Sequence, residues 1–167
     1  MAETNCFIPQ LTTLGYLEKD GCYLMMHRIS KKNDINQGKW IGVGGKVEKG
    51  ESPLECMKRE CLEETGLVWK DPVLRGVITF NFCKDHQMLD SEIMFLYHGK
   101  DFSGSLKECS EGVLEWVPVS QIPALPLWKG DLLFLEKMRT EKDCFEMRLD
   151  YEGDDLIFAS FNGKQIV

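Results

Sequence analysis

Apolar and polar positions along the first forty residues predict two strands and a loop. The apolar segments 11–17 and 22–29 flank a short polar stretch that ends in Asp20 and Gly21, a dipeptide typical of tight turns between strands. We therefore expect these two segments to form a β-hairpin. The segment 30–39 is polar and rich in residues that interrupt strands, which indicates a loop.

A glycine-rich segment and then a helix follow the loop. The apolar run 40–47 is interrupted by glycines, which indicates that another group approaches this backbone closely. Ser52 suits the N-cap of a helix, Pro53 suits its first turn, and Glu55 completes a capping box. Gly66 suits the C-terminal stop. Between these ends, small or apolar side chains recur at helical spacing, at Leu54, Met57, Cys61 and Thr65.

The remaining pattern predicts further strands and a second helix. Apolar segments of strand length occupy residues 75–82, 91–99, 113–119, 144–151 and 155–161, and the last two flank a short turn. The segment 131–142 has the period of an amphipathic helix. Strands interleaved with two helices favour an α/β or α+β sandwich. Because no repeat or linker interrupts the pattern, we expect a single domain over residues 1–167.

Composition and charge narrow the class of protein. The 43% hydrophobic and 28% charged content is that of an ordinary globular protein. A net charge of −7 argues against binding to nucleic-acid polymers, although divalent cations would still allow an acidic protein to bind phosphates. With no signal-like or membrane-length apolar segment, we expect a cytoplasmic protein without membrane association. The seven cysteines form no CxxC pair, which predicts free and mostly buried thiols.

The first helix carries an unusual group of acidic residues. Glu60, Glu63 and Glu64 stand at i, i+3 and i+4, so their side chains gather on one helical face. Three converging carboxylates repel one another, and a hard divalent cation such as Mg²⁺ relieves the repulsion. Taken alone, three such glutamates more often form a solvated acidic face than a metal site.

A longer pattern decides between these two interpretations. The segment from Gly45 to Leu67 matches G-x5-E-x7-R-E-U-x-E-E-x-G-U, where U is an apolar residue. This segment resembles the Nudix box of the Nudix hydrolases, with Cys61 as a mild departure in the first apolar slot. The resemblance implies the Nudix fold, an α/β/α sandwich with a mixed β-sheet. It also implies hydrolysis of a nucleoside diphosphate linked to another group, assisted by Mg²⁺ or Mn²⁺.

The same resemblance implies roles for individual residues. The implied metal ligands are the side chains of Glu60, Glu63 and Glu64 and the carbonyl oxygen of Gly44. Arg59 would orient Glu51 or a ligand carboxylate through a salt bridge. The carboxylate that accepts a proton from the attacking water is left open among Glu51, Glu64 and Glu111.

Other segments resemble a particular branch of the family. The stretches GKWIGVGGK, RGVITF, EGVLEWVP and WKGD are similar to the MutX branch of the MutT-type enzymes, over roughly residues 9–131. That branch implies a nucleotide substrate, an oxidised purine triphosphate such as 8-oxo-dGTP, cleaved to the monophosphate and pyrophosphate. The sequence leaves open whether the protein is a monomer or a homodimer. Trp128 and Asp131 fall where a related animal enzyme has pocket residues, whereas Ile41 replaces its base-reading asparagine. Lys46 and Arg28 are further candidates for binding the substrate, although the end of a strand favours a solvent-facing position for Arg28.

Two other classes of function stay open at this stage. Nudix hydrolases of dinucleoside polyphosphates or ADP-ribose share the same box. A Nudix-fold sensor would bind a nucleotide without cleaving it, but such domains typically lose box glutamates. None of these glutamates is missing here.

Overall fold

The computed structural model describes residues 7–30 and 32–167, so Cys6 lies outside the described residues. The strands are β1 (Gln10–Lys19), β2 (Cys22–His27), β3 (Trp40–Ile41), β4 (Leu67–Trp69), β5 (Val73–Lys84), β6 (Gln87–Gly99), β7 (Phe102–Gly104), β8 (Val113–Pro118), β9 (Phe145–Glu152), β10 (Asp155–Phe161) and β11 (Lys164–Gln165). The helices are α1 (Pro53–Thr65), the 3₁₀ helix η1 (Val119–Ala124) and α2 (Lys129–Thr140).

Most of these strands join one mixed sheet. Among the described residues its order is β11-β10-β9-β5-β6-β1-β2-β3, with β8 paired to β2. Strand β1 runs parallel to β6 over eight residue pairs and meets β2 in only two, Glu18↔Tyr23 and Lys19↔Cys22. The predicted hairpin of β1 and β2 therefore forms only at its tip, because the rest of β1 pairs with a strand that lies far along the chain.

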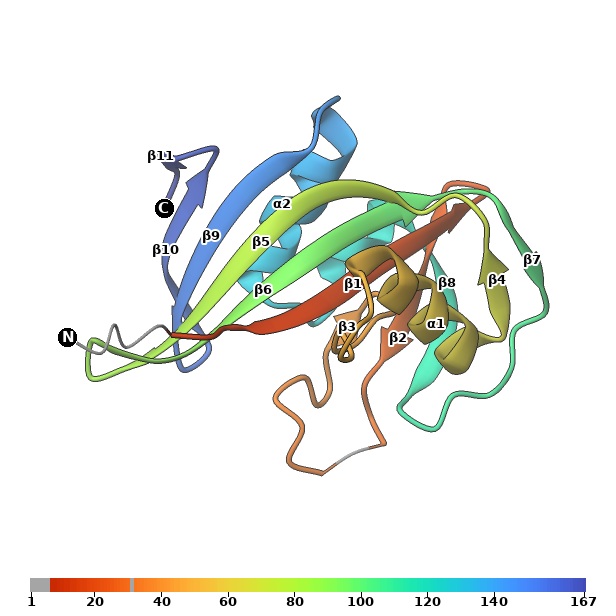
Figure 1. Ribbon diagram of the computed structural model, residues 1–167, viewed down its shortest axis with the longest axis horizontal. Helices are drawn as coiled ribbons and strands as arrows, with labels where there is room; N and C mark the ends of the chain where they lie inside the picture. The colour runs from red at the N-terminus through yellow and green to blue at the C-terminus, as the bar shows by residue number, and fades with distance from the viewer. Residues whose placement is uncertain (1–6, 31) are drawn as a thin grey trace.

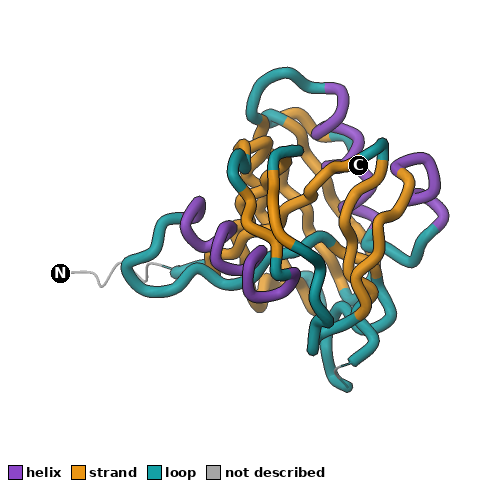
Figure 2. Tube along the Cα trace, turned by 90° about the vertical axis from the view of Figure 1, so that its right-hand side faces the viewer, coloured by secondary structure: helices purple, strands orange, loops and turns teal. Residues whose placement is uncertain are grey.

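The two long helices cover opposite faces of the sheet (Figures 1 and 2). Met57 and Cys61 of α1 pack in one hydrophobic cluster with Trp69. Phe134 and Met138 of α2 belong to a second cluster with strand residues from β5 and β9. This arrangement confirms the predicted α/β/α sandwich with a mixed sheet.

The local signals for α1 act as its sequence predicts. The Ser52 side chain accepts a hydrogen bond from the Glu55 backbone, and the Glu55 carboxylate accepts one from the Ser52 backbone, which completes the capping box. Gly66 ends the helix with φ of 79°, a left-handed conformation that glycine adopts without strain. The second helix begins two residues before its predicted start and ends at Thr140.

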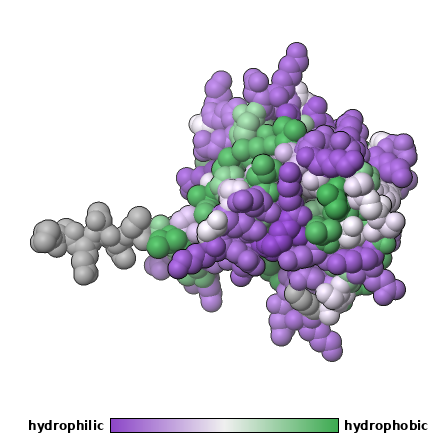
Figure 3. Space-filling view, turned by 45° about the vertical axis from the view of Figure 1, so that its right-hand side comes forward, coloured by the Kyte–Doolittle hydropathy of each residue, from purple (hydrophilic) through white to green (hydrophobic). Residues whose placement is uncertain are grey.

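Exposed and buried positions add three observations. The described cysteines are free thiols, but only Cys56 and Cys61 of these are buried, so the expectation of mostly buried thiols is wrong. Apolar side chains stay exposed where the chain enters β1, at Phe7 and Ile8. Figure 3 shows hydrophobic patches among the hydrophilic side chains of one face of the molecule. No helix in the described part of the chain combines the length and apolarity needed to cross a membrane.

Candidate active site

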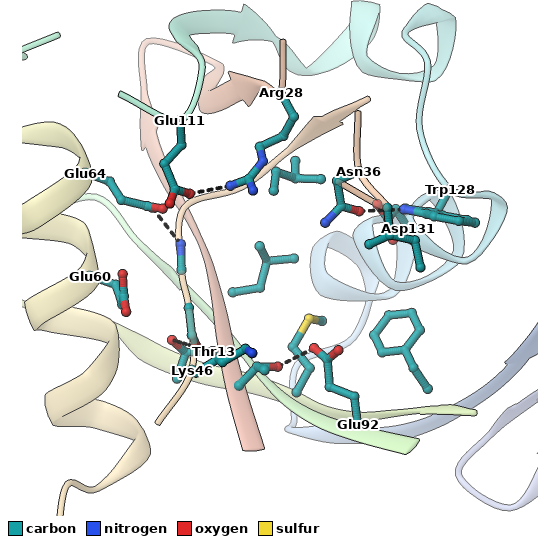
Figure 4. Close-up of a pocket in the computed structure, with 18 of the residues that line it drawn as sticks. Thr13, Arg28, Asn36, Lys46, Glu60, Glu64, Glu92, Glu111, Trp128 and Asp131 are labelled. Carbon is teal, nitrogen blue, oxygen red and sulfur yellow. Dashed lines mark hydrogen bonds and ion pairs between the residues drawn. The ribbon is translucent and has the colours of Figure 1, made fainter. Parts of the chain in front are cut away.

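A cavity of about 530 Å³ opens beside the glycine-rich segment that precedes α1. Residues of β1, β5 and β6 line it, together with residues of α1, of the loops before β3 and β8, and of the start of α2. Acidic side chains gather near α1, and Trp128 and Asp131 lie near α2 (Figure 4). The cavity lining includes most of the residues that the sequence singled out: Arg28, Gly44, Lys46, Glu60, Glu64, Glu111, Trp128 and Asp131. Glu51, Arg59 and Glu63 lie outside its lining.

The glycine-rich segment runs close to both β1 and α1. The Thr13 backbone donates a hydrogen bond of 2.8 Å to the Gly45 carbonyl, and the Gly44 backbone donates one of 3.0 Å to the Glu64 carboxylate. A Cβ on Gly44 would collide with the Thr13 carbonyl oxygen, and a Cβ on Gly45 would collide with the Glu60 carboxylate. The glycines therefore permit the close approach that their sequence pattern predicts.

Arg59 donates hydrogen bonds to three carboxylates beside the cavity. Its Nε and Nη2 donate to the two oxygens of Glu51 at 2.7 and 3.0 Å, and its Nη1 donates to Glu60 at 2.8 Å and to Glu63 at 3.2 Å. The paired Arg59 guanidinium holds the pKa of Glu51 at about 2. The Glu63 side chain is 60% exposed. The role of Glu63 as a metal ligand stays a prediction. The role of Arg59 in orienting a ligand carboxylate for catalysis also stays a prediction.

Negative charge accumulates where Glu60, Glu64 and Glu111 meet the cavity. The pKa of Glu64 is raised to about 8, mainly by burial and also by the charges of Glu60 and Glu111, whereas the hydrogen bond from Gly44 opposes the shift. Burial also raises the pKa of Glu60, against the opposing effect of Arg59. These shifts express the withdrawal of the carboxylates from water and, in smaller part, their mutual repulsion.

The donor atoms at this end fit a hard divalent cation. They are carboxylate and backbone oxygens, which Mg²⁺ and Mn²⁺ prefer, and a bound cation would offset the repulsion that the raised pKa values express. Within the described residues, no three acidic, His or Cys side chains are drawn together around a metal-sized space. Glu60 and Glu64 are the acidic side chains of α1 that line the cavity.

Arg28 lies at the cavity wall and is bound by two carboxylates. Its Nε donates to Asp34 at 2.7 Å, and its Nη1 donates to Glu111. The Arg28 side chain is 13% exposed, so the sequence-based alternative of a solvent-facing residue is wrong. Contact between Arg28 and a substrate stays a prediction.

Aromatic side chains line the other end of the cavity. The Trp128 ring packs edge-on against Tyr151, with ring centroids 5.3 Å apart, and its Nε1 donates to the Asn36 side chain at 2.8 Å. The Lys39 ammonium lies 4.2 Å from the centroid of the Trp128 ring. Asp131 is 4% exposed, and its burial raises the pKa of its carboxyl to about 8. This carboxyl is therefore largely protonated at neutral pH and can both donate and accept hydrogen bonds.

Several lining residues could not be identified from the sequence. Asn36 belongs to a polar loop without a motif, and Tyr151 and Glu92 belong to strands far from the Nudix-like segment. The only sequence signal for Tyr151 and Glu92 was the alternation of side chains along a strand. Alternation indicates which residues of one strand lie on the same face of the sheet, but not which cavity that face lines.

The fold and this cavity define a class of protein. The sequence profile of the NUDIX domain matches residues 12–138, so the chain belongs to the Nudix family. The hydrolases of this family generally use a divalent metal ion.

Comparison with individual proteins agrees with that assignment. The chain is 30% identical over 151 residues to a Danio rerio protein named oxidized purine nucleoside triphosphate hydrolase, covering 90% of this chain and 92% of that protein. A Mus musculus protein of the same name is 36% identical over 129 residues, covering 77% and 80% of the two chains. The crystal structure of a mutator MutT protein from Bacillus halodurans superimposes with a TM-score of 0.83 at 26% identity, covering 93% and 99%. The chain is accordingly a Nudix hydrolase of MutT-like type.

Proposed function

We propose that this single-domain protein is a Mg²⁺-dependent pyrophosphohydrolase of nucleoside triphosphates, with oxidised purine nucleotides such as 8-oxo-dGTP as its substrates. The observation that carries the proposal is one cavity that has an acidic end beside α1 and an end lined by aromatic side chains beside α2. A triphosphate with bound cations matches the first end in charge, and a flat base matches the second in shape. The names of the Danio rerio and Mus musculus relatives support the same substrate class.

At the acidic end, we assign cation binding to Glu60 and Glu64, with Glu63 and the Gly44 carbonyl as further ligands. A bound Mg²⁺ would neutralise phosphate charge and lower the pKa of a coordinated water. The chain itself orients the carboxylates, because Arg59 holds Glu60 and the Gly44 backbone holds Glu64. Lys46 lines the same cavity and is suited to a phosphate oxygen.

The contacts narrow the choice of proton acceptor. Glu51 is committed to Arg59 by two hydrogen bonds, and its pKa of about 2 makes its carboxylate a weak base. Glu64 and Glu111 line the cavity instead. These two residues are therefore the stronger candidates to accept the proton of the attacking water.

At the aromatic end, we assign base recognition to Asp131 and Trp128. A protonated Asp131 carboxyl offers one donor and acceptor oxygens, which suits the edge of an oxidised purine that carries both kinds of group. Ile41 lines the cavity with an apolar side chain, so specificity does not depend on a polar side chain at that position. The substrate belongs to the free nucleotide pool of the cytoplasm, in keeping with the net charge of −7, which disfavours nucleic-acid polymers.

Product analysis on a panel of nucleotides tests the proposal. The panel holds normal and 8-oxo purine triphosphates, CTP, diadenosine polyphosphates and ADP-ribose, each with Mg²⁺, and Glu64→Gln serves as the blank. We expect the fastest turnover with 8-oxo-dGTP, giving the monophosphate and pyrophosphate. Faster turnover of ADP-ribose or of a dinucleotide would overturn the assigned substrate class.

A further inference from the structure

Glu92 is a partly buried carboxyl in the cavity to which the proposed chemistry gives no role. It lies on β6, and its Oε1 accepts a hydrogen bond of 2.5 Å from the Thr12 hydroxyl on β1. Burial raises the pKa of Glu92, while the hydrogen bond from Thr12 and the charge of Lys46 oppose the shift. Burying a carboxyl costs free energy, so an apolar side chain would be more favourable at this position if it bound no ligand.

The strand register locates Glu92 between the two ends of the cavity. On one side, Glu92 stands directly opposite Phe80 of β5. Phe80 stacks on Tyr151, with ring centroids 6.3 Å apart, and Tyr151 contacts Trp128. Glu92 is therefore next to a row of aromatic rings that leads to the proposed base pocket.

On its other side, Glu92 is linked to the phosphate end. Its hydrogen-bond partner Thr12 pairs through a β-bridge with Lys46, the residue suited to a phosphate oxygen. Figure 4 shows Glu92 on the same side of the cavity as Lys46, whose charge acts on the Glu92 carboxyl, with Asp131 and Trp128 farther along the cavity. In any nucleotide, the sugar is the part that lies between the phosphates and the base.

We propose that Glu92, supported by Thr12, is a sugar-binding residue that accepts a hydrogen bond from a hydroxyl group of the nucleotide sugar. This inference rests on the proposed function, since it takes the phosphates to lie near α1 and the base near Trp128. The Thr12 hydroxyl donates to one carboxylate oxygen, which leaves acceptor capacity on Glu92 for the substrate. Glu92 is thus a determinant of which sugar the enzyme accepts.

The test removes the Glu92 carboxyl and the sugar hydroxyls, separately and together. Wild type, Glu92→Ala and Glu92→Gln are assayed with the ribo, 2′-deoxy, 3′-deoxy and 2′,3′-dideoxy forms of one purine triphosphate. Glu146→Gln is the matched control, because Glu146 is exposed on β9 and lies outside the cavity lining. The measured quantity is kcat/KM, together with the release of pyrophosphate.

A hydrogen bond to a charged group corresponds to a loss of about tenfold to a hundredfold in kcat/KM when either partner is removed. For the wild-type enzyme, we expect kcat/KM to be lower by this factor on the dideoxy substrate than on the ribo substrate. For Glu92→Ala, we expect the same loss relative to wild type on the ribo substrate and no loss relative to wild type on the dideoxy substrate. Glu92→Gln, which keeps an acceptor oxygen, should recover part of the activity. The single-deoxy substrate that reproduces the loss identifies the contacted hydroxyl.

Two results would overturn the inference. If Glu92→Ala lowers kcat/KM by the same factor on every substrate, Glu92 supports the strands and does not bind the sugar. If it lowers kcat/KM on none, the carboxyl does not contact the substrate. Failure of the proposed function is a separate outcome, because it appears in the wild-type enzyme as a lack of pyrophosphate release from all the triphosphates.

Discussion

Arg28 and Glu111 form an ion pair at the cavity wall although 83 positions separate them in the sequence. Arg28 directly follows β2 and also binds Asp34 in the same loop, whereas Glu111 belongs to the loop before β8. One guanidinium therefore ties together two loops that line the same cavity. It also places a cation among carboxylates that would otherwise repel one another.

Removing that cation should impair catalysis more than it impairs folding. In Arg28→Met, Glu111 loses a charged hydrogen-bond donor close to Glu60 and Glu64. We expect kcat/KM to fall by about tenfold to a hundredfold, since hydrogen bonds to charged groups contribute about 1.5–3 kcal/mol. Steady-state kinetics on the best substrate measure the loss. Arg28→Lys should recover part of it, and equal activity of wild type and Arg28→Met would contradict this role.

The acidic end should bind metal in a way that stability measurements can detect. Without metal, the raised pKa of Glu64 means that its contribution to stability is present below pH 4.5 and is lost as pH rises to about 8. Over this range the free energy of unfolding falls by up to about 1.4 kcal/mol per pH unit. We expect Mg²⁺ to raise the Tm of wild type at pH 8, and to raise that of Glu64→Gln much less. An equal shift in both proteins would show that Mg²⁺ acts elsewhere.

The same carboxylates should be indispensable for turnover. Glu60→Gln and Glu64→Gln each remove one anionic ligand while keeping the shape of the side chain. We expect both variants to be folded, by circular dichroism, and to lack measurable hydrolysis of the best substrate with Mg²⁺. Turnover near the wild-type rate in either variant would exclude that residue from the cation site.

The Arg59–Glu51 pair should contribute to stability with the opposite pH dependence. Because Arg59 lowers the pKa of Glu51 to about 2, the contribution is present above pH 4.5 and disappears as pH falls towards 2. We expect the difference in free energy of unfolding between wild type and Glu51→Gln to be constant from pH 5 to 7 and to shrink below pH 4. Urea titrations at each pH measure it, and a difference that grows in acid would refute the pairing.

Asp131 should give base recognition its own pH profile. Its carboxyl is protonated below about pH 8 and charged above it, because burial disfavours the charged form. We expect the KM of wild type for 8-oxo-dGTP to rise as pH passes through 8. Asp131→Asn, which stays neutral and keeps a donor and an acceptor, should show a flatter profile over the same range. Parallel profiles for the two proteins would remove Asp131 from base recognition.

The sequence predicted those parts of the protein that depend on neighbouring residues. Ser52, Glu55 and Gly66 mark the ends of α1 through contacts within one helical turn, so their pattern is sufficient. The grouping of Glu60 and Glu64 in one cavity follows from their spacing on the same helix. Spacing alone also grouped Glu63 with them, but the Glu63 side chain lies outside the cavity lining and pairs with Arg59.

Features that depend on distant pairing could not be predicted in this way. The pairing of β1 with β6 places Thr12 beside Glu92, and no short-range pattern encodes such a match. The same holds for Asn36 and Trp128, which are 92 positions apart and meet only in the folded chain. Assigning Thr12, Asn36 and Glu92 to the cavity therefore required the structure.

The parallel pairing of β1 with β6 also bears on how the chain is made. Contact between Thr12 and Glu92 closes a loop of 80 residues, at an entropic cost of about 4 kcal/mol from the logarithmic dependence on loop length. At roughly 5–20 residues per second, a ribosome would need on the order of 4–16 s to add the residues that separate β1 from its partner. During that interval the apolar strand β1 lacks this neighbour. The part of the cavity that β1 and β6 line together therefore forms late in folding. A nascent chain is most prone to aggregation before β6 emerges from the ribosome.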